Sequence, residues 1–309
     1  MDKTYVIGHK SPDMDSIAAA ISYAAFLNLV FKTDNYIPAR AGEINEVTKF
    51  VLDKFGLKAP ELLDNAAGKR LILVDHNEAA QSLDGRSEAK ILAILDHHKV
   101  NFSYDEPIYL DIRPWGSSNS IIQSLFKVAG QKIEKSLAGV MLSAVLDDTV
   151  ITKSPTTTPK DKEAIEYLAA LAEIEDWKKY GLEMFKIKSG AKNMSAEQII
   201  KNDYKDFEFK AGKFGIGQIE TVDLGDFAGR EDELLKALSA LKKDGGYHSV
   251  VLFITDIMQE GSRFLVATDK TEEIEKALGA KLDKGQVYVP GIMSRKKQVV
   301  PKFMEVFDK

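Results

Sequence analysis

Three short apolar runs of the sequence each end in acidic and histidine side chains: His9, Asp13 and Asp15 follow residues 4–7, Asp75 and His76 follow residues 71–74, and Asp96, His97 and His98 follow residues 91–95. Four of the five histidines of the chain lie in these segments. Continuous apolar strands are typical of buried parallel sheets, and α/β proteins place ligands and catalytic groups at the carboxyl ends of such strands. We therefore expect these side chains to converge at one edge of a sheet and to bind metal.

Each of these groups also has a simpler explanation. A histidine after a strand is often hydrogen-bonded without binding a ligand, and an aspartate there often caps the next helix. His76 fits this explanation, because the polar residues after it resemble the start of a capped helix. Asp15 could cap an apolar helix expected over residues 17–31, which leaves Asp13 unexplained. Three strand ends that all carry such groups favour a metal site.

The ligand types restrict the metal. The chain has no cysteine, which disfavours a structural zinc finger. Carboxylate oxygen together with imidazole nitrogen favours Mn²⁺, Co²⁺, Zn²⁺ or Fe²⁺ over Ca²⁺. Four or more carboxylates would overcharge one divalent ion, whereas two ions ~3.5–4 Å apart that share a carboxylate form the usual clamp for displacement at phosphorus. We therefore expect two ions.

The order of these motifs resembles a known family. I-G-H-x-x-P-D-x-D-S at residues 7–16, V-D-H-N-E at 74–78 and D-H-H at 96–98 resemble the DHH phosphoesterase superfamily. S-R-K-K-Q at 294–298, with V-V-P after it, resembles specifically the family II, manganese-dependent inorganic pyrophosphatases. The resemblance covers essentially the whole chain. Residues 113–116 depart from it, because they read R-P-W-G where E-P-V-G is usual.

The resemblance implies a ligand set for each of the two ions: His9, Asp13 and Asp75 for one, and Asp15, Asp75, His97 and Asp148 for the other. Asp75 would bridge the ions. Asp148 is preferred to Asp147 because K-S-P-T at residues 153–156 matches the family downstream of that position. Asp96 would orient a ligating imidazole and raise its basicity.

The resemblance also implies the activity, which is hydrolysis of inorganic pyrophosphate to two phosphates by a hydroxide activated by two metals, with the substrate held between two domains. The cofactors would be two Mn²⁺ or Co²⁺ ions per subunit, with additional Mg²⁺ or Mn²⁺ bound with the substrate. Four residues would act on the substrate: His98 at the leaving oxygen, and Lys205, Arg295 and Lys296 as cations that bind phosphate oxygens.

Two other functions are compatible with parts of the pattern. The first is a DHH phosphoesterase that acts on short oligonucleotides, polyphosphate or cyclic dinucleotides, but the segment 294–298 has no aromatic residue on which a base could stack. The second is a sensor that binds pyrophosphate or metal without turnover. A sensor is expected to have lost a metal ligand or a phosphate-binding cation, and this sequence has all of them.

The composition fits an enzyme of the cytoplasm. Of the 309 residues 44% are hydrophobic, the net charge is −5, and no apolar run approaches the ~20 residues of a membrane span. The negative charge argues against nucleic acid as a partner, and the absence of cysteine fits a reducing compartment. We expect a homodimer formed through the N-terminal domain, with no nucleic-acid or membrane partner.

The elements that position these residues predict an α/β fold with a parallel-sheet N-terminal DHH domain and a second, smaller α/β C-terminal domain. We predict a metal-binding catalytic domain over residues 1–188, a hinge linker over 189–194 and a substrate-binding domain over 195–309. Helices expected at 43–55, 117–128 and 135–146 would cover both faces of the first sheet. The glycine-rich residues 212–217 resemble a phosphate loop, but the strand-like alternation after them indicates a hairpin.

Overall fold

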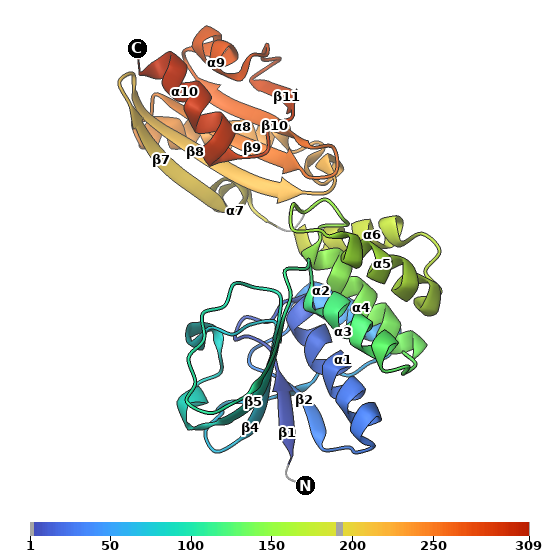
Figure 1. The fold of residues 1–309 in the computed structure, drawn as a ribbon. Helices are drawn as coiled ribbons and strands as arrows, with labels where there is room; N and C mark the ends of the chain where they lie inside the picture. Colours follow the sequence, from blue (N-terminus) through green and yellow to red (C-terminus); the bar gives the residue numbers. More distant parts are fainter. Residues whose placement is uncertain (1–2, 190–193, 309) are drawn as a thin grey trace. The chain divides into compact units, whose positions relative to one another are not determined.

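The computed structural model describes residues 3–189 and 194–308 of the chain. The chain divides into two compact units, Met1–Ile187 and Lys188–Lys309, and each is described here by itself (Figure 1). Most of the predicted hinge, residues 190–193, lies outside the described residues.

The first unit contains a parallel sheet in the order β3-β2-β1-β4-β5-β6. Its strands are β1 (Thr4–Ile7), β2 (Tyr36–Arg40), β3 (Glu61–Leu62), β4 (Arg70–Val74), β5 (Lys90–Asp96) and β6 (Tyr109–Ile112). The strand order reverses between β1 and β4, and this switch point is where open α/β sheets bind ligands. The predicted α/β class, with its N-terminal parallel sheet, is confirmed.

The α-helices of the first unit are α1 (Met14–Phe31), α2 (Glu46–Phe55), α3 (Ser118–Val128), α4 (Lys135–Asp148), α5 (Pro159–Ala172) and α6 (Trp177–Ser189). In Figure 1 α1, α3 and α4 lie on one side of the sheet. The prediction of helices on both faces is wrong. Right-handed connections from β4 to β5 and from β5 to β6 pass over the other face, where residues 75–89 and 97–108 form only two short 3₁₀ turns, η1 (Ala79–Gln81) and η2 (Arg86–Glu88).

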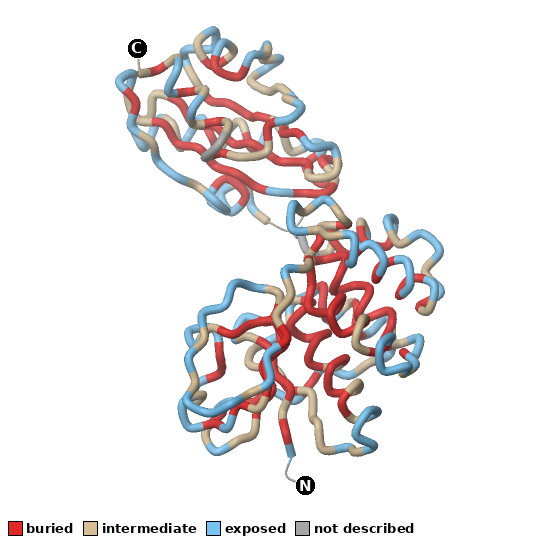
Figure 2. The backbone as a smooth tube through the Cα atoms, in the orientation of Figure 1, coloured by how far each residue is buried: buried red, intermediate tan, exposed pale blue. Residues whose placement is uncertain are grey.

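Helix α1 is the core helix of this unit. Among the residues that the structure describes, it is the one helix long and apolar enough by composition to cross a membrane, with a mean hydropathy of 1.5 over 18 residues, and it begins three residues before the apolar helix expected over residues 17–31. However, 61% of it is buried inside the unit (Figure 2), where it packs against β1, β2, α3 and α4. Its hydrophobicity is therefore explained by packing in the protein core.

The second unit contains a mixed five-stranded sheet in the order β11-β10-β9-β8-β7. Its strands are β7 (Asp203–Phe209), β8 (Gly212–Thr221), β9 (Ser249–Asp256), β10 (Gly261–Thr268) and β11 (Gln286–Pro290). Strands β8 and β9 run parallel, and the other pairs are antiparallel. Strands β7 and β8 form the predicted antiparallel hairpin, but its turn lies at residues 210–211, and the glycine-rich residues 212–217, interpreted as the turn, belong to β8.

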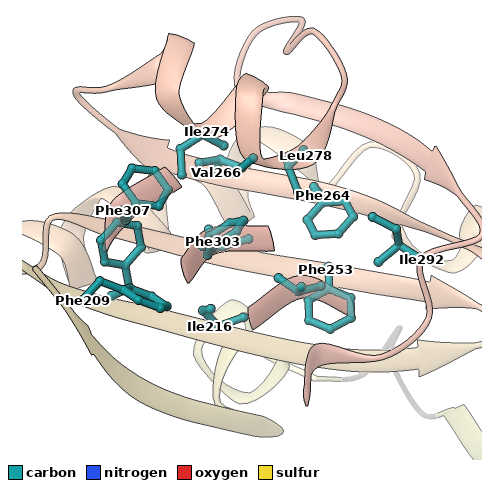
Figure 3. Close-up of a cluster of buried hydrophobic side chains, with 14 residues drawn as sticks. Phe209, Ile216, Phe253, Phe264, Val266, Ile274, Leu278, Ile292, Phe303 and Phe307 are labelled. Atoms are coloured by element: carbon teal, nitrogen blue, oxygen red, sulfur yellow. The ribbon is translucent and has the colours of Figure 1, made fainter. Parts of the chain in front are cut away.

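Helices cover both faces of this second sheet. One face packs against α9 (Thr271–Leu278) and α10 (Val300–Phe307) through a core that includes Phe253, Phe264 and Phe303 (Figure 3). The other face packs against α7 (Ala196–Lys201), the 3₁₀ turn η4 (Leu224–Phe227) and α8 (Glu231–Asp244). A π-helical turn, η5 (Arg295–Val299), directly precedes α10.

Candidate metal centre

The carboxyl ends of β1, β4 and β5 bring acidic and imidazole groups together, as the strand pattern predicts, and Asp148 joins them from the end of α4. Two groups have ligand atoms that all lie within 4.8 Å of one another: Asp15, Asp75, His97 and Asp148 in one, and His9, Asp13 and Asp75 in the other. A third such group contains Asp75, His97 and His98. These first two groups have the same members as the two ligand sets that the family resemblance implies, and Asp75 belongs to both.

Asp75 lies at the centre of this arrangement. Its Oδ2 is 3.5 Å from Nε2 of His9, and its Oδ1 is 3.2 Å from Nε2 of His97. The residue is 2% exposed, and its φ of 60° lies in the left-handed region, which aspartate tolerates better than most residues. Such backbone strain is typical of functional sites, where it aims a side chain. Each carboxylate oxygen therefore faces a different group.

Asp13 and Asp15 have different roles from those expected of a helix start. Asp13, not Asp15, caps α1, because its Oδ1 accepts a hydrogen bond of 2.9 Å from the backbone N–H of Ser16. The same oxygen lies 3.6 Å from Nε2 of His9. Asp15 lies inside the first turn and is fully buried. The cap therefore explains Asp13 locally and leaves Asp15 as the residue that needs another explanation.

Asp15 is held by the N-terminus of α3, a contact that was not predicted. Its carboxylate accepts hydrogen bonds from Ser117 Oγ (2.5 Å), the Ser118 N–H (2.8 Å) and Asn119 Nδ2 (2.8 Å). Ser118 Oγ also donates to Asp75 Oδ1 at 3.2 Å. The sequence signal for this contact is the run S-S-N-S at residues 117–120, four polar residues that are all buried.

His97 is oriented by a backbone carbonyl. Its Nδ1–H donates to the carbonyl oxygen of Trp115 at 3.1 Å, which fixes the tautomer and leaves Nε2 toward Asp75 and Asp148. The expectation that Asp96 orients a ligating imidazole of the predicted set is wrong. Asp96 Oδ1 instead accepts from Nδ1 of His98 at 2.9 Å and from the N–H of His97 at 2.7 Å, because adjacent side chains point in different directions.

His76 is a structural residue, as predicted. Its Nδ1–H donates to the carbonyl oxygen of Val74 at 2.9 Å, and its Nε2 lies 3.1 Å from Ser82 Oγ. Burial lowers the pKa of His76 to about 4, so the ring is neutral at physiological pH. Both ring nitrogens are therefore already occupied.

Asp148 supplies the test of whether these residues suit a cation. Its Oδ2 is buried, has no hydrogen-bond partner among the residues that the structure describes, and lies 3.5 Å from Nε2 of His97. Burial, together with the charges of Asp15 and Asp75, raises the pKa of the Asp148 carboxyl. A buried carboxylate oxygen without a donor is costly unless a cation or proton meets it. The donor set of four carboxylates and two imidazoles fits two divalent ions.

The surrounding negative charge raises the pKa of both candidate histidine ligands. Burial alone would lower the pKa of His9, but its contacts with Asp13 and Asp75 raise that pKa to about 10. Burial would likewise lower the pKa of His97, whereas the hydrogen bond to Asp75 and the charge of Asp15 raise it to about 9. Burial and the charge of Asp15 raise the pKa of Asp75 to about 6. Without metal, protons therefore neutralise part of this anionic centre.

Binding of Mn²⁺ to the metal-free protein should release about two protons at pH 7.5, because the raised pKa values keep His9 and His97 protonated and a metal needs the neutral rings. The affinity for Mn²⁺ should then rise with pH up to about 10, where His9 also loses its proton. Calorimetric titration in buffers of different ionisation enthalpy measures the released protons directly. A binding enthalpy that is the same in all buffers would contradict these protonation states.

The residues predicted to bind phosphate belong to two parts of the chain. His98 lines a cavity of about 280 Å³ beside Asp75, Asn77 and Lys99 in the first unit. Lys205 is exposed on the edge strand β7 of the second unit. Arg295 also belongs to the second unit, and the side chain of Lys296 lies outside the described residues.

Arg295 is not exposed as a phosphate-binding cation would be. The residue is 7% exposed, and its Nη2 donates to both carboxylate oxygens of Asp203 at 2.7 and 2.8 Å. Its Nη1 donates to the carbonyl oxygens of Asp203 (2.5 Å) and Ile216 (3.2 Å). Ile216 is the register partner of Lys205, so the two predicted cations lie at the same edge of the second sheet.

Comparison with known proteins agrees with this geometry. Residues 3–145 match the model of the DHH family, N-terminal domain, and residues 182–306 match that of the DHHA2 domain. The chain is 46% identical to the manganese-dependent inorganic pyrophosphatase of Methanocaldococcus jannaschii, over 96% of this chain and 97% of that protein. It is 44% identical to the probable manganese-dependent inorganic pyrophosphatase of Archaeoglobus fulgidus, over 98% of each.

The chain belongs to the manganese-dependent inorganic pyrophosphatase family. The crystal structure of a putative family II inorganic pyrophosphatase from Methanococcus jannaschii agrees with this assignment, with a TM-score of 0.63 and 44% identity over 99% of this chain and 100% of that one. The family resemblance inferred from the motifs is therefore confirmed. In this chain the segment R-P-W-G at residues 113–116, which departs from the usual pattern, contributes the carbonyl of Trp115 that orients His97.

Proposed function

We propose that this chain hydrolyses inorganic pyrophosphate to two phosphates at a centre of two Mn²⁺ or Co²⁺ ions. The observation that supports this function best is the Asp75 carboxylate, whose two oxygens face His9 and His97 from the two ligand groups. A carboxylate shared in this way is the usual bridge of a two-metal site that acts on phosphate esters and anhydrides. Membership of the family supports the choice of pyrophosphate as substrate.

In this proposal His9, Asp13 and Asp75 hold one ion, and Asp15, Asp75, His97 and Asp148 hold the other. When bound, the ions would supply Lewis acidity that activates water and neutralises phosphate charge. The chain itself orients the ligands: Trp115 fixes the tautomer of His97, and the N-terminus of α3 holds Asp15. Loss of such a supporting contact typically lowers metal affinity or activity by roughly 10- to 100-fold.

His98 is proposed to act at the leaving oxygen. Its Nδ1–H is held by Asp96, and 56% of its side chain is exposed, so Nε2 is the nitrogen that remains for the substrate. The hydrogen bond to Asp96 raises the pKa of His98, which favours the protonated ring that can donate to phosphate. Lys205 and Lys296 are proposed to bind phosphate oxygens directly, and Arg295 is proposed to do so by exchanging its contact with the Asp203 carboxylate for phosphate. That pyrophosphate is held between the two domains, with residues 189–194 as the hinge, stays a prediction from the sequence.

Phosphate release tests the proposed function. The protein loaded with Mn²⁺ should release two phosphates from each pyrophosphate and much less from ATP, tripolyphosphate or a dinucleotide. A preference for the dinucleotide or for tripolyphosphate would instead favour another activity of the DHH superfamily. Binding of pyrophosphate without any phosphate release would favour a sensor.

Three finer properties also belong to the proposal. We propose that additional Mg²⁺ or Mn²⁺ is bound with the substrate, since pyrophosphate is a polyanion that binds Mg²⁺ readily. We propose a homodimer formed through the N-terminal unit. We also propose a cytoplasmic location, which the absence of cysteine supports.

Replacing a phosphate-binding cation should affect substrate binding and turnover but not the metal centre. We expect Lys296→Ala to raise KM and lower kcat, with a loss of roughly 10- to 100-fold in kcat/KM, the range for a hydrogen bond between charged groups. Steady-state kinetics measures this change, and calorimetry should give a normal affinity for Mn²⁺. Lys281→Ala is the control, because the exposed Lys281 pairs with Glu275 of α9 at 2.6 Å and belongs neither to β7 and β8 nor to the segment 294–298. Normal kinetics in Lys296→Ala would remove this residue from the substrate site.

A further inference from the structure

The loop at residues 291–294, which leads from β11 into the S-R-K-K-Q segment, is held by side chains along its whole length. The carboxamide of Gln298 accepts hydrogen bonds from the N–H groups of Met293 (2.9 Å) and Ser294 (3.0 Å) through Oε1. Its Nε2 donates to the carbonyl oxygen of Gly291 at 2.6 Å. One side chain thus closes the loop by binding three of its backbone groups.

Two strands of the second sheet hold the remaining carbonyl groups of this loop. Ser262 Oγ, from β10, donates to the carbonyl oxygen of Ile292 at 2.6 Å. Gln218 Nε2, from β8, lies 3.2 Å from the carbonyl oxygen of Met293 and 3.4 Å from Thr255 Oγ1. Thr255 Oγ1 is in turn 3.0 Å from Ser262 Oγ. These contacts form a buried polar network beneath the loop.

Such a network is expected to fix the loop in one conformation. Buried polar groups cost free energy when they lose their partners, so the fully bonded arrangement is strongly preferred over alternatives. The loop continues into the π-helical turn η5, where the N–H groups of Gln298 and Val299 both donate to the carbonyl oxygen of Ser294. Short π-helical segments occur frequently at functional sites.

The network also connects this segment to the strand beside Lys205. Gln218 lies on β8, which pairs with β7, and Arg295 contacts Asp203 and Ile216 of the same two strands. We propose that Gln298 and Gln218 are positioning residues that fix the segment 294–297 and so set the spacing of the cations that bind pyrophosphate. This inference rests on the proposed function, because it assigns these glutamines to the substrate site of that reaction.

The test compares variants that remove each tether. Gln298→Ala should raise KM for pyrophosphate about tenfold and weaken binding of imidodiphosphate, a non-hydrolysable analogue, by a similar factor. Affinity for Mn²⁺ should stay normal, because the candidate metal ligands belong to the other compact unit. Gln218→Met, which keeps most of the side-chain shape, should have an effect of the same sign. Kinetics and calorimetry on the full-length, Mn²⁺-loaded protein provide these values.

Gln259→Ala is the matched control, because Gln259 belongs to a turn of the same unit and its side chain binds Asp256 instead of the loop. It should leave KM unchanged. If Gln298→Ala fails to fold, Gln218→Met alone carries the test. Unchanged KM and analogue affinity in a folded variant, with an active wild type, would overturn the positioning role. A wild type that does not hydrolyse pyrophosphate would instead overturn the proposed function.

Discussion

Asp75→Asn should lower kcat for pyrophosphate by roughly a thousandfold or more, because loss of the shared carboxylate disturbs both ions, which together stabilise the transition state by several kcal/mol. Asparagine is a better test than alanine. Like aspartate, it tolerates the left-handed backbone that residue 75 adopts at φ 60°, so the expected loss reports on the charge and not on the fold. Phosphate release and calorimetric titration with Mn²⁺ measure the two effects.

Two variants separate a bridge from an ordinary ligand. His97→Gln should weaken mainly one Mn²⁺ site, since His97 belongs to only one of the two proposed ligand sets. Asp84→Ala removes an exposed carboxylate that pairs with Lys10 and lies outside the three groups of candidate ligands, so it should change neither affinity. An Asp75→Asn protein that binds two Mn²⁺ ions with wild-type affinity would exclude Asp75 as the bridge.

Metal-stripped protein should recover much higher activity with Mn²⁺ or Co²⁺ than with Mg²⁺ as the sole ion. His9 and His97 offer imidazole nitrogen, which Mn²⁺ and Co²⁺ accept and which Mg²⁺ binds poorly because it prefers oxygen ligands and retains its waters. Mg²⁺ added to the Mn²⁺-loaded protein should still help, as a partner of the substrate. The measurement is phosphate release after chelation, dialysis and reconstitution with each ion.

A matched variant strengthens this metal test. His76→Gln alters a histidine at the same edge of the sheet whose ring nitrogens already contact Val74 and Ser82. It should keep the wild-type preference for Mn²⁺, whereas His9→Asp should shift the preference toward Mg²⁺. Full activity of the wild type with Mg²⁺ alone would show that the nitrogen ligands do not select the metal.

The candidate ligands could be predicted because their signal is local. His9, Asp75 and His97 each follow a strand within two residues, and the carboxyl ends of parallel strands share one edge of the sheet, so spacing along the chain predicts their proximity in space. Asp148, at the end of α4, was expected only from the family resemblance. The contacts that support the ligands have no such signal. Asp15 meets Ser117 and Asn119 across about a hundred residues, and His97 is oriented by a backbone carbonyl, which any residue at position 115 would supply.

The features that were missed share this non-local character. Among the described residues, the other face of the first sheet carries no α-helix because residues 75–89 and 97–108, which pass over it, form only 3₁₀ turns and loops, and hydrophobic patterns do not reveal this (Figure 1). The pairing of Arg295 with Asp203 joins residues 92 positions apart. An arginine in a basic run was predicted to bind phosphate from its type alone. The burial of Arg295 depends on how β7 and β8 pack against the loop at residues 291–294.

The central claim is that Asp75 joins two metal ions in one centre, and paramagnetic resonance of the wild-type protein during titration with Mn²⁺ tests it most directly. Two ions bound per chain and ~3.5–4 Å apart should give the spectrum of an exchange-coupled pair, which replaces the signal of isolated Mn²⁺ as the second ion binds. Binding of a single ion per chain, or of two ions whose spectra remain those of isolated Mn²⁺, would contradict the account.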